Sequence, residues 1–201
     1  FANHISGVDD NISSSGGEHY AWNDIIGWID FGHSTSPSSS VEVKNSQLKG
    51  YASSAVGAIA LDCATAPGAN ACGFGNPWRV SNTTSGKLAG WAWNDVIGWI
   101  SFCGRNDPDG TGLLTGADST WNGTKWVCPD NPTYEVVINP SDKTFAGWAW
   151  NDVIGWISFC GNDSSGSTGG GTEWQCPTSP IPTYRVVTTW DNQLATDAYL
   201  I

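Results

Sequence analysis

Six cysteines are the residues whose type and spacing most clearly predict chemistry in this chain. Four occupy matched places: two end the tetrapeptide ISFC, and two lie in a W-x-C-P sequence shortly before PTYEVV or PTYRVV. An even number of matched cysteines is typical of disulfides, and the match favours bonds between consecutive cysteines. Zinc is the alternative, but C-x2-C pairs are absent and His4, His19 and His33 lie far from the cysteines in sequence. The predicted pairs are Cys63–Cys72, Cys103–Cys128 and Cys160–Cys176.

Disulfides persist in oxidising compartments, so we expect an extracellular or cell-surface protein. The chain has no methionine and starts at Phe1, which predicts export with a cleaved leader. No run of about 18 apolar residues is present, so no transmembrane segment is expected. The net charge of −11, with eight Lys and Arg, argues against a nucleic-acid partner, which would need a basic surface.

The sequence offers no constellation for catalysis, so we expect a protein that is not an enzyme. The histidines lie within the first 33 residues, without a serine or cysteine nucleophile motif beside them. Asp24, Asp95 and Asp152 each follow an asparagine at a predicted hairpin bend, where carboxylates are ordinary turn residues. Choosing two of them as the acid and base of a glycosidase would be arbitrary.

One loop, RNDPDGTG at 105–112, spaces oxygen ligands around a glycine as calcium sites do, at Asp107, Asp109 and Thr111. It lacks the closing bidentate glutamate, so a plain acidic turn is the alternative, and no other cofactor is expected. Four N-x-S/T sequons are candidate glycosylation sites: Asn11, Asn82, Asn122 and Asn162.

The sequence AGWAWNDVIGWISFCG occurs unchanged at 89–104 and 146–161, and we expect each copy to form a β-hairpin. A turn with an even number of residues places Trp91, Trp93, Ile100 and Phe102 on one face, which we assign to the core together with Trp148 and Trp150. An odd turn would mix aspartate into this face. The other face carries a second set of tryptophans, which either packs beneath a loop or sheet or is available to a ligand or partner: Trp28, Trp99 and Trp156.

The repeated element is a three-stranded unit: strand A, a polar turn, and the hairpin of strands B and C. We therefore expect an all-β fold of tandem antiparallel units, disulfide-stapled and sandwich- or prism-like. A flexible arm at 1–18 precedes a single domain at 19–201. Its units are a half unit at 19–32, full units at 41–75 (with weakened aromatic positions), 78–130 and 133–178, and a half unit at 183–201.

The two half units complement each other, because the first has strands B and C and the last has strand A with a B-like tail. They either meet within one molecule, closing a ring of about four sheets, or meet between molecules and build a head-to-tail chain. Ten residues are predicted for this joint: Tyr20, Trp22, Trp28, Ile29, Phe31, Tyr184, Val186, Leu194, Tyr199 and Ile201.

The hairpin sequence GWAWNDVIGWISF resembles the tryptophan-rich GWAW-x4-GWISF repeats of secreted or surface proteins of uncultivated bacteria. The resemblance covers 19–32, 89–104 and 146–161 well and 50–63 poorly. It implies an extracellular setting and no characterised activity. The sequence thus predicts an extracellular structural protein, a subunit of a homopolymeric filament joined by strand complementation. The alternative is a secreted carbohydrate-binding or adhesin module that binds surface glycans through exposed tryptophans.

Overall fold

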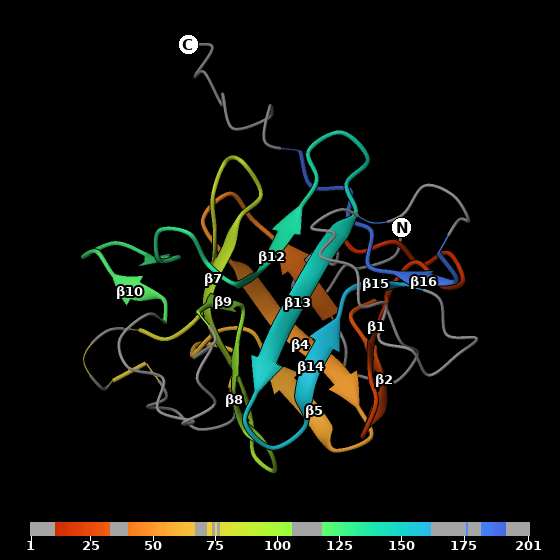
Figure 1. The fold of residues 1–201 in the computed structure, drawn as a ribbon, viewed down its shortest axis with the longest axis horizontal. Helices are drawn as coiled ribbons and strands as arrows, with labels where there is room; N and C mark the ends of the chain where they lie inside the picture. The colour runs from red at the N-terminus through yellow and green to blue at the C-terminus, as the bar shows by residue number, and fades with distance from the viewer. Residues whose placement is uncertain are drawn as a thin grey trace, which may run out of the picture.

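The computed structural model describes residues 11–32, 40–66, 72, 73, 75, 77–105, 118–161, 176 and 182–191. These residues form an all-β fold of antiparallel strands, as predicted, and no helix occurs among them. Eight strands close into a barrel in which each strand pairs with the next and the last pairs with the first (Figure 1). In order, the barrel strands are β1 (Tyr20–Asn23), β2 (Gly27–Asp30), β4 (Leu48–Ser54), β5 (Gly57–Ala60), β7 (Leu88–Asn94), β8 (Gly98–Ser101), β13 (Phe145–Asn151) and β14 (Gly155–Ser158).

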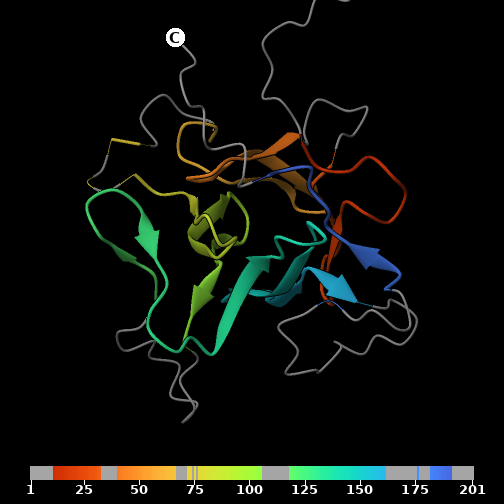
Figure 2. The ribbon, with the colours of Figure 1, turned by 90° about the horizontal axis from the view of Figure 1, so that it is seen from above.

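Four hairpins, β1–β2, β4–β5, β7–β8 and β13–β14, make the barrel wall, and Figure 2 looks along the barrel with these hairpins arranged in a ring. The division of the chain into repeat units remains a prediction. Shorter strands lie around the barrel. The surrounding strands are β3 (Ser40–Val43), β6 (Val80–Asn82), β9 (Cys103–Gly104), β10 (Thr120–Trp121), β11 (Trp126–Val127), β12 (Tyr134–Ile138), β15 (Cys160–Gly161) and β16 (Tyr184–Arg185).

The predicted hairpin register is wrong. Asn94 pairs with Gly98, so the turn holds three residues, 95–97, and Trp93 lies opposite Trp99 instead of Gly98. Gly98, the first residue after the turn, has a φ of 77°, a left-handed conformation that glycine adopts without steric cost. The shift of one residue moves the tryptophans to the outer face. Trp91, Trp93, Trp148 and Trp150 are therefore half-buried on the outside of the barrel instead of in its core.

The barrel interior holds smaller side chains than predicted, because eight strands enclose little more than a filled core. Ala92, paired with Ile100, is fully buried, whereas an indole in its place would overfill the space. Four phenylalanines pack at the centre, where the ring of Phe159 lies 5.3–5.8 Å from the other three. The inward positions of the hairpins include Ala21, Ile29, Phe31, Ala52, Ile59, Phe102, Phe145, Ala149 and Ile157.

Buried asparagines link neighbouring hairpins around the ring. Nδ2 of Asn94 donates to the carbonyls of Val56 and Ala58 in the preceding hairpin, at 3.2 and 2.9 Å. Its Oδ1 accepts the amides of residues 96 and 97 in its own turn. Asn23 and Asn151 make the equivalent bonds to the hairpins that precede them in the ring. The asparagine of the N-D pair is thus a link between hairpins, which explains its burial.

The first hairpin receives its strand A from the other end of the chain. Val186 pairs with His19, and Thr188 pairs with Ile12. Further backbone bonds run from Val187 N to Glu18 O and from Ser13 N to Val187 O. Of the two arrangements left open by the sequence, this structure has the one in which the ends meet within one molecule.

The barrel has two distinct ends, seen at the bottom and top of Figure 1. The hairpin end carries the turns within the four hairpins, at residues 24–26, 55–56, 95–97 and 152–154. The opposite end carries the turns that lead from β3, β6 and β12 into the barrel, at residues 44–47, 83–87 and 139–144.

Candidate functional site

Tryptophan pairs form a belt on the outer face of three hairpins. Trp93 and Trp99 face each other across β7–β8 in an edge-to-face contact with ring centroids 4.7 Å apart. Trp22–Trp28 and Trp150–Trp156 repeat the contact at 4.6 Å. In each pair the first indole donates its Nε1–H to a turn aspartate at 2.8–2.9 Å, which fixes the ring orientation. These acceptors are Asp24, Asp95 and Asp152, the carboxylates that the sequence places in the turns.

The three tryptophans predicted as a ligand or partner face lie on this belt. Trp28 is 41% exposed and Trp99 48%, whereas Trp156 is half-buried. Each also contacts a second aromatic ring at 5.4–5.5 Å, from Tyr184, Trp78 and Tyr134 respectively. Trp28, Trp99 and Trp156 are therefore partly covered by other aromatic rings, and each exposes only a ring edge or part of a ring face to a ligand.

The structure brings most of the predicted joint residues together, but within one chain. Trp28 packs against Tyr184, and Tyr20 and Trp22 lie on the outer face of the same hairpin. Ile29, Phe31 and Val186 are buried in the core. Leu194, Tyr199 and Ile201 lie outside the described residues.

The three disulfides form the predicted pairs, Cys63–Cys72, Cys103–Cys128 and Cys160–Cys176. They close loops with sequence separations of 9, 25 and 16 residues. No helix in the described part of the chain has the length and apolar character needed to cross a membrane.

Two of the four sequons are engaged in the fold. Asn82 is 1% exposed and donates to Lys44 O at 2.8 Å, so its amide is inaccessible to a glycan. Asn11 bonds Val43 through both side-chain atoms, at 2.9 and 2.8 Å. Asn122 is exposed in a turn that its Oδ1 stabilises, and Asn162 lies outside the described residues.

The residues of the predicted calcium loop, Asp107, Asp109 and Thr111, also lie outside the described residues. In the part of the chain that the structure describes, no three His, Cys, Asp or Glu side chains are grouped as metal ligands. His19 bonds Asp30 on the same hairpin, Nδ1 to Oδ1 at 2.6 Å. Burial raises the pKa of Asp62 and Asp118, and raises the pKa of Tyr134 to about 12. Asp118 lies beside Tyr134, whose hydroxyl donates to Ser101 Oγ at 2.9 Å, while Asp62 accepts hydrogen bonds from Gln47 and Thr65.

Sequence reasoning missed an exposed apolar ring at the hairpin end. Ile25, Val96 and Val153 are 69%, 70% and 64% exposed, and each follows the turn aspartate of its hairpin. The next residue in each turn packs inward against the core. The repeated N-D-apolar-apolar-G turn was the available signal, since a turn seldom carries two large apolar residues.

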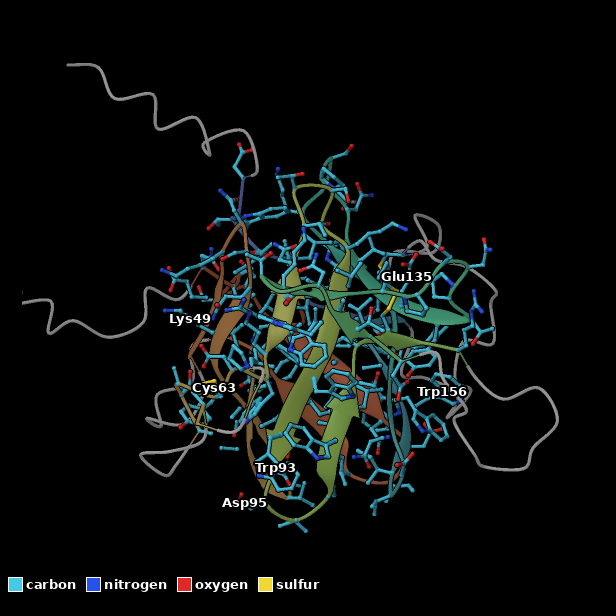
Figure 3. The ribbon with its side chains drawn as sticks, turned by 90° about the vertical axis from the view of Figure 1, so that its left-hand side faces the viewer. Lys49, Cys63, Trp93, Asp95, Glu135 and Trp156 are labelled. Atoms are coloured by element: carbon cyan, nitrogen blue, oxygen red, sulfur yellow. A yellow bond between two sulfur atoms is a disulfide. The ribbon has the colours of Figure 1, made fainter. Side chains whose placement is uncertain are left out.

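Two of the hollows on the surface of the described residues have charged side chains in their linings. One, of about 300 Å³, lies beside the opposite end and includes Lys87, Glu135 and Cys176 in its lining. The other, of about 130 Å³, lies between β5 and β7 near the hairpin end and includes Tyr51, Trp93 and Asp95. Figure 3 shows Trp93 and Asp95 side by side at this end of the barrel.

Comparison with known proteins adds no relative: no protein-family model, curated protein or solved structure matches this chain.

Proposed function

We propose that this protein is a structural subunit that assembles head to tail into an extracellular filament. The observation that carries the proposal is the apolar ring at the hairpin end, where Ile25, Val96 and Val153 expose 64–70% of their surface. The three side chains hold equivalent places on three hairpin turns at one end of the barrel, and large apolar side chains exposed together on one face favour a contact site. A heterologous contact through this end would build an open chain.

The opposite end carries charged side chains of both signs. It carries Lys44, Lys87 and Lys143, each in a turn that enters the barrel. The hairpin end carries the three exposed turn aspartates beside the apolar ring. Each lysine has an acidic neighbour within 2.9–3.7 Å, and Asp142 lies in the same turn as Lys143, so this end carries no net positive charge. Individual pairs between these lysines and the turn aspartates of a neighbouring subunit would favour one orientation of stacking, while burial of the ring would supply most of the affinity.

Strand exchange is a second mode of head-to-tail assembly, through a different joint. The strand that completes the first hairpin is the last described segment, and the same pairs with residues 12–19 would form if a neighbour donated it. A cysteine pair at Ile12 and Thr188, which face each other across this pairing, separates the two modes. After oxidation, a covalent ladder on non-reducing gels indicates exchange, and a cross-linked monomer that still polymerises indicates docking between ends.

Electron microscopy and analytical ultracentrifugation of the purified full chain test the function itself. The triple variant Ile25→Ser, Val96→Ser and Val153→Ser should fold with all disulfides but lose its polymers, because the apolar ring is gone. The matched control, Val96→Ile with Val153→Ile, keeps the ring apolar and should polymerise. A wild-type protein that stays monomeric at millimolar concentration, with and without calcium, would refute the filament.

The second candidate is a secreted carbohydrate-binding or adhesin module, favoured by the exposure of Trp28 and Trp99. Retention on immobilised polysaccharide by a protein that never polymerises would support it. Loss of that retention in Trp28→Ala with Trp99→Ala, but not in Val96→Ser, would place the binding on the belt.

A further inference from the structure

The β4–β5 hairpin differs from the other three barrel hairpins on its outer face. Where they place a tryptophan pair, it places Ser53 opposite Ala58. Its turn is one residue shorter, because Ser54 pairs with Gly57, and the missing residue is the turn aspartate. The hairpin that departs from the pattern thus has small side chains where the others are bulky.

This departure leaves a hollow. A Cβ atom added to Gly27, Gly98 or Gly155 would lie 3.8 Å from the indole that covers that glycine. At Gly57, the equivalent position, nothing lies within 4 Å. The space is part of the pocket of about 130 Å³ between β5 and β7. Its lining comprises Tyr51, Val56, Gly57, Ala58, Ala60, Trp93, Asn94 and Asp95.

Two aromatic rings form the walls of this pocket. Ala60 pairs with Tyr51 on one side and with Trp93 on the other, so the two rings stand on strands separated by one alanine. Neighbouring strands lie about 4.8 Å apart, so the backbones that carry Tyr51 and Trp93 are about 10 Å from each other. Ala60 is only 2% exposed, whereas Gly57 and Ala58 are exposed, so the open part of the pocket lies over Gly57 and Ala58.

Polar groups lie at the same pocket. The Asp95 carboxylate accepts the indole N–H of Trp93 through Oδ1 at 2.8 Å, and Oδ2 has no hydrogen-bond donor among the described residues. The Tyr51 hydroxyl supplies a donor: burial, with smaller contributions from Asp62 and Asp95, raises its pKa and keeps it protonated at neutral pH. An acceptor and a donor therefore accompany two apolar walls.

We propose that this pocket binds a single pyranose ring of a glycan, stacked between Tyr51 and Trp93 with its hydroxyls bonded to Asp95 and Tyr51. A pyranose presents C–H groups on its faces, which the negative face of an aromatic ring attracts, and hydroxyls around its rim. A cavity of about 150 Å³ accommodates benzene, so a hollow of this size suits one six-membered ring and not a drug-sized ligand. The pocket shares Asp95 with the hairpin end of the barrel, but none of the three side chains of the apolar ring lines it.

A compact organic cation is the competing ligand class, because Trp, Tyr and Asp side chains also form cation-binding cages. The floor of the pocket argues against it, since Ala58 and Ala60 provide no third aromatic wall. Asp95 is exposed, so its charge is screened and attracts a cation weakly. Its carboxylate should disfavour acidic sugars, which predicts a preference for neutral glycosides over uronates.

Saturation-transfer NMR and calorimetry with methyl glycosides of neutral hexoses, N-acetylhexosamines and uronic acids test the site. Wild-type protein should bind a neutral glycoside, and Ala58→Trp, which restores the residue of the other hairpins, should weaken binding at least tenfold. Asp95→Asn keeps the bond to Trp93 but removes the charge, and should also weaken binding. Its matched control, Asp152→Asn on β13–β14, should bind like wild type, because Trp150 and Trp156 already fill the equivalent space.

Unchanged melting temperatures and disulfides in these variants establish that they fold. Absence of binding by every neutral glycoside would overturn the proposal, as would full affinity in Ala58→Trp. Competition by tetramethylammonium, with affinity that falls as salt rises, would replace the sugar with a cation. Polymerisation that persists in Ala58→Trp would show that loss of the pocket leaves the proposed filament intact.

Discussion

Replacing Asn151 with alanine tests the idea that buried asparagines hold the hairpins in a ring. The Asn151 side chain is only 1% exposed, and it makes four hydrogen bonds within the protein. Nδ2 donates to the carbonyls of Ile97 and Trp99 at 2.9 and 2.7 Å, and Oδ1 accepts the amides of Val153 and Ile154 at 2.9 Å. Alanine removes all four at once.

The cost depends on which partners regain water. Val153 is exposed, and the carbonyl of Trp99 lies in a partly buried contact, so both can be rehydrated. The carbonyl of Ile97 and the amide of Ile154 are buried and would be left unpaired. An unsatisfied buried group costs about 1–3 kcal/mol, so with two such groups Asn151→Ala should lower the free energy of unfolding by about 2–6 kcal/mol.

Urea unfolding of the oxidised protein, followed by circular dichroism, measures this difference. Hydrogen exchange should show that the Ile154 amide loses protection in the variant. The control is Asp152→Ala, which removes only an exposed acceptor of Trp150 and should cost less than about 1 kcal/mol. Equal stabilities for the two variants, with unchanged m-values, would show that the asparagines do not link the ring.

Three further perturbations have distinct expected outcomes. Gly147→Ala should lower the free energy of unfolding in urea by about 2–3 kcal/mol, because φ is 90° and the new Cβ would meet the Glu135 carbonyl. The control Gly123→Ala, which has open space at a φ of 97°, should lower it by less. The reverse order of the two variants would contradict the close approach at Gly147. Removing Cys103–Cys128, which closes a separation of 25 residues, should lower stability by about 3.5 kcal/mol, against about 2.6 kcal/mol for the separation of 9 residues at Cys63–Cys72. Burial raises the pKa of Asp62 above its ordinary value of 3.8, so the stability that this side chain contributes in acid is lost as the pH rises from 3.8 through the raised pKa. Asp62→Asn should flatten that part of the pH–stability curve. An unchanged slope in the variant would show that other groups cause the pH dependence.

Several structural features could be predicted from the sequence because their signals are local or repeated. Consecutive cysteines in matched positions predicted all three disulfides, which the structure confirms. The duplicated sequence predicted β-hairpins preceded by a further strand, and β6 and β12 do precede β7 and β13 as their pairing partners. The complementary half units predicted that the chain ends would pair, and Val186 does pair with His19.

The hairpin register could not be predicted, because it depends on contacts between hairpins. The even turn was favoured because it gathered Trp91 and Trp93 with Ile100 on one apolar face. In the structure, the side chain of Asn94 must point inward to reach the carbonyls of Val56 and Ala58, which sets the three-residue turn. The hydrophobic pattern alone therefore favoured the wrong face.

The sequence by itself determined the disulfide pairs, the all-β class and the strands that complement each other at the chain ends, because neighbouring residues and exact repeats carry those signals. Only the tertiary structure decided that the ends meet within one chain and that the tryptophans lie outside. A closed eight-stranded barrel encloses only a filled core, so its inward hairpin positions hold alanine, isoleucine and phenylalanine, and the hairpin tryptophans lie on the outer face. The pocket between Tyr51 and Trp93 likewise exists only because the tertiary fold pairs β5 with β7 of the next hairpin.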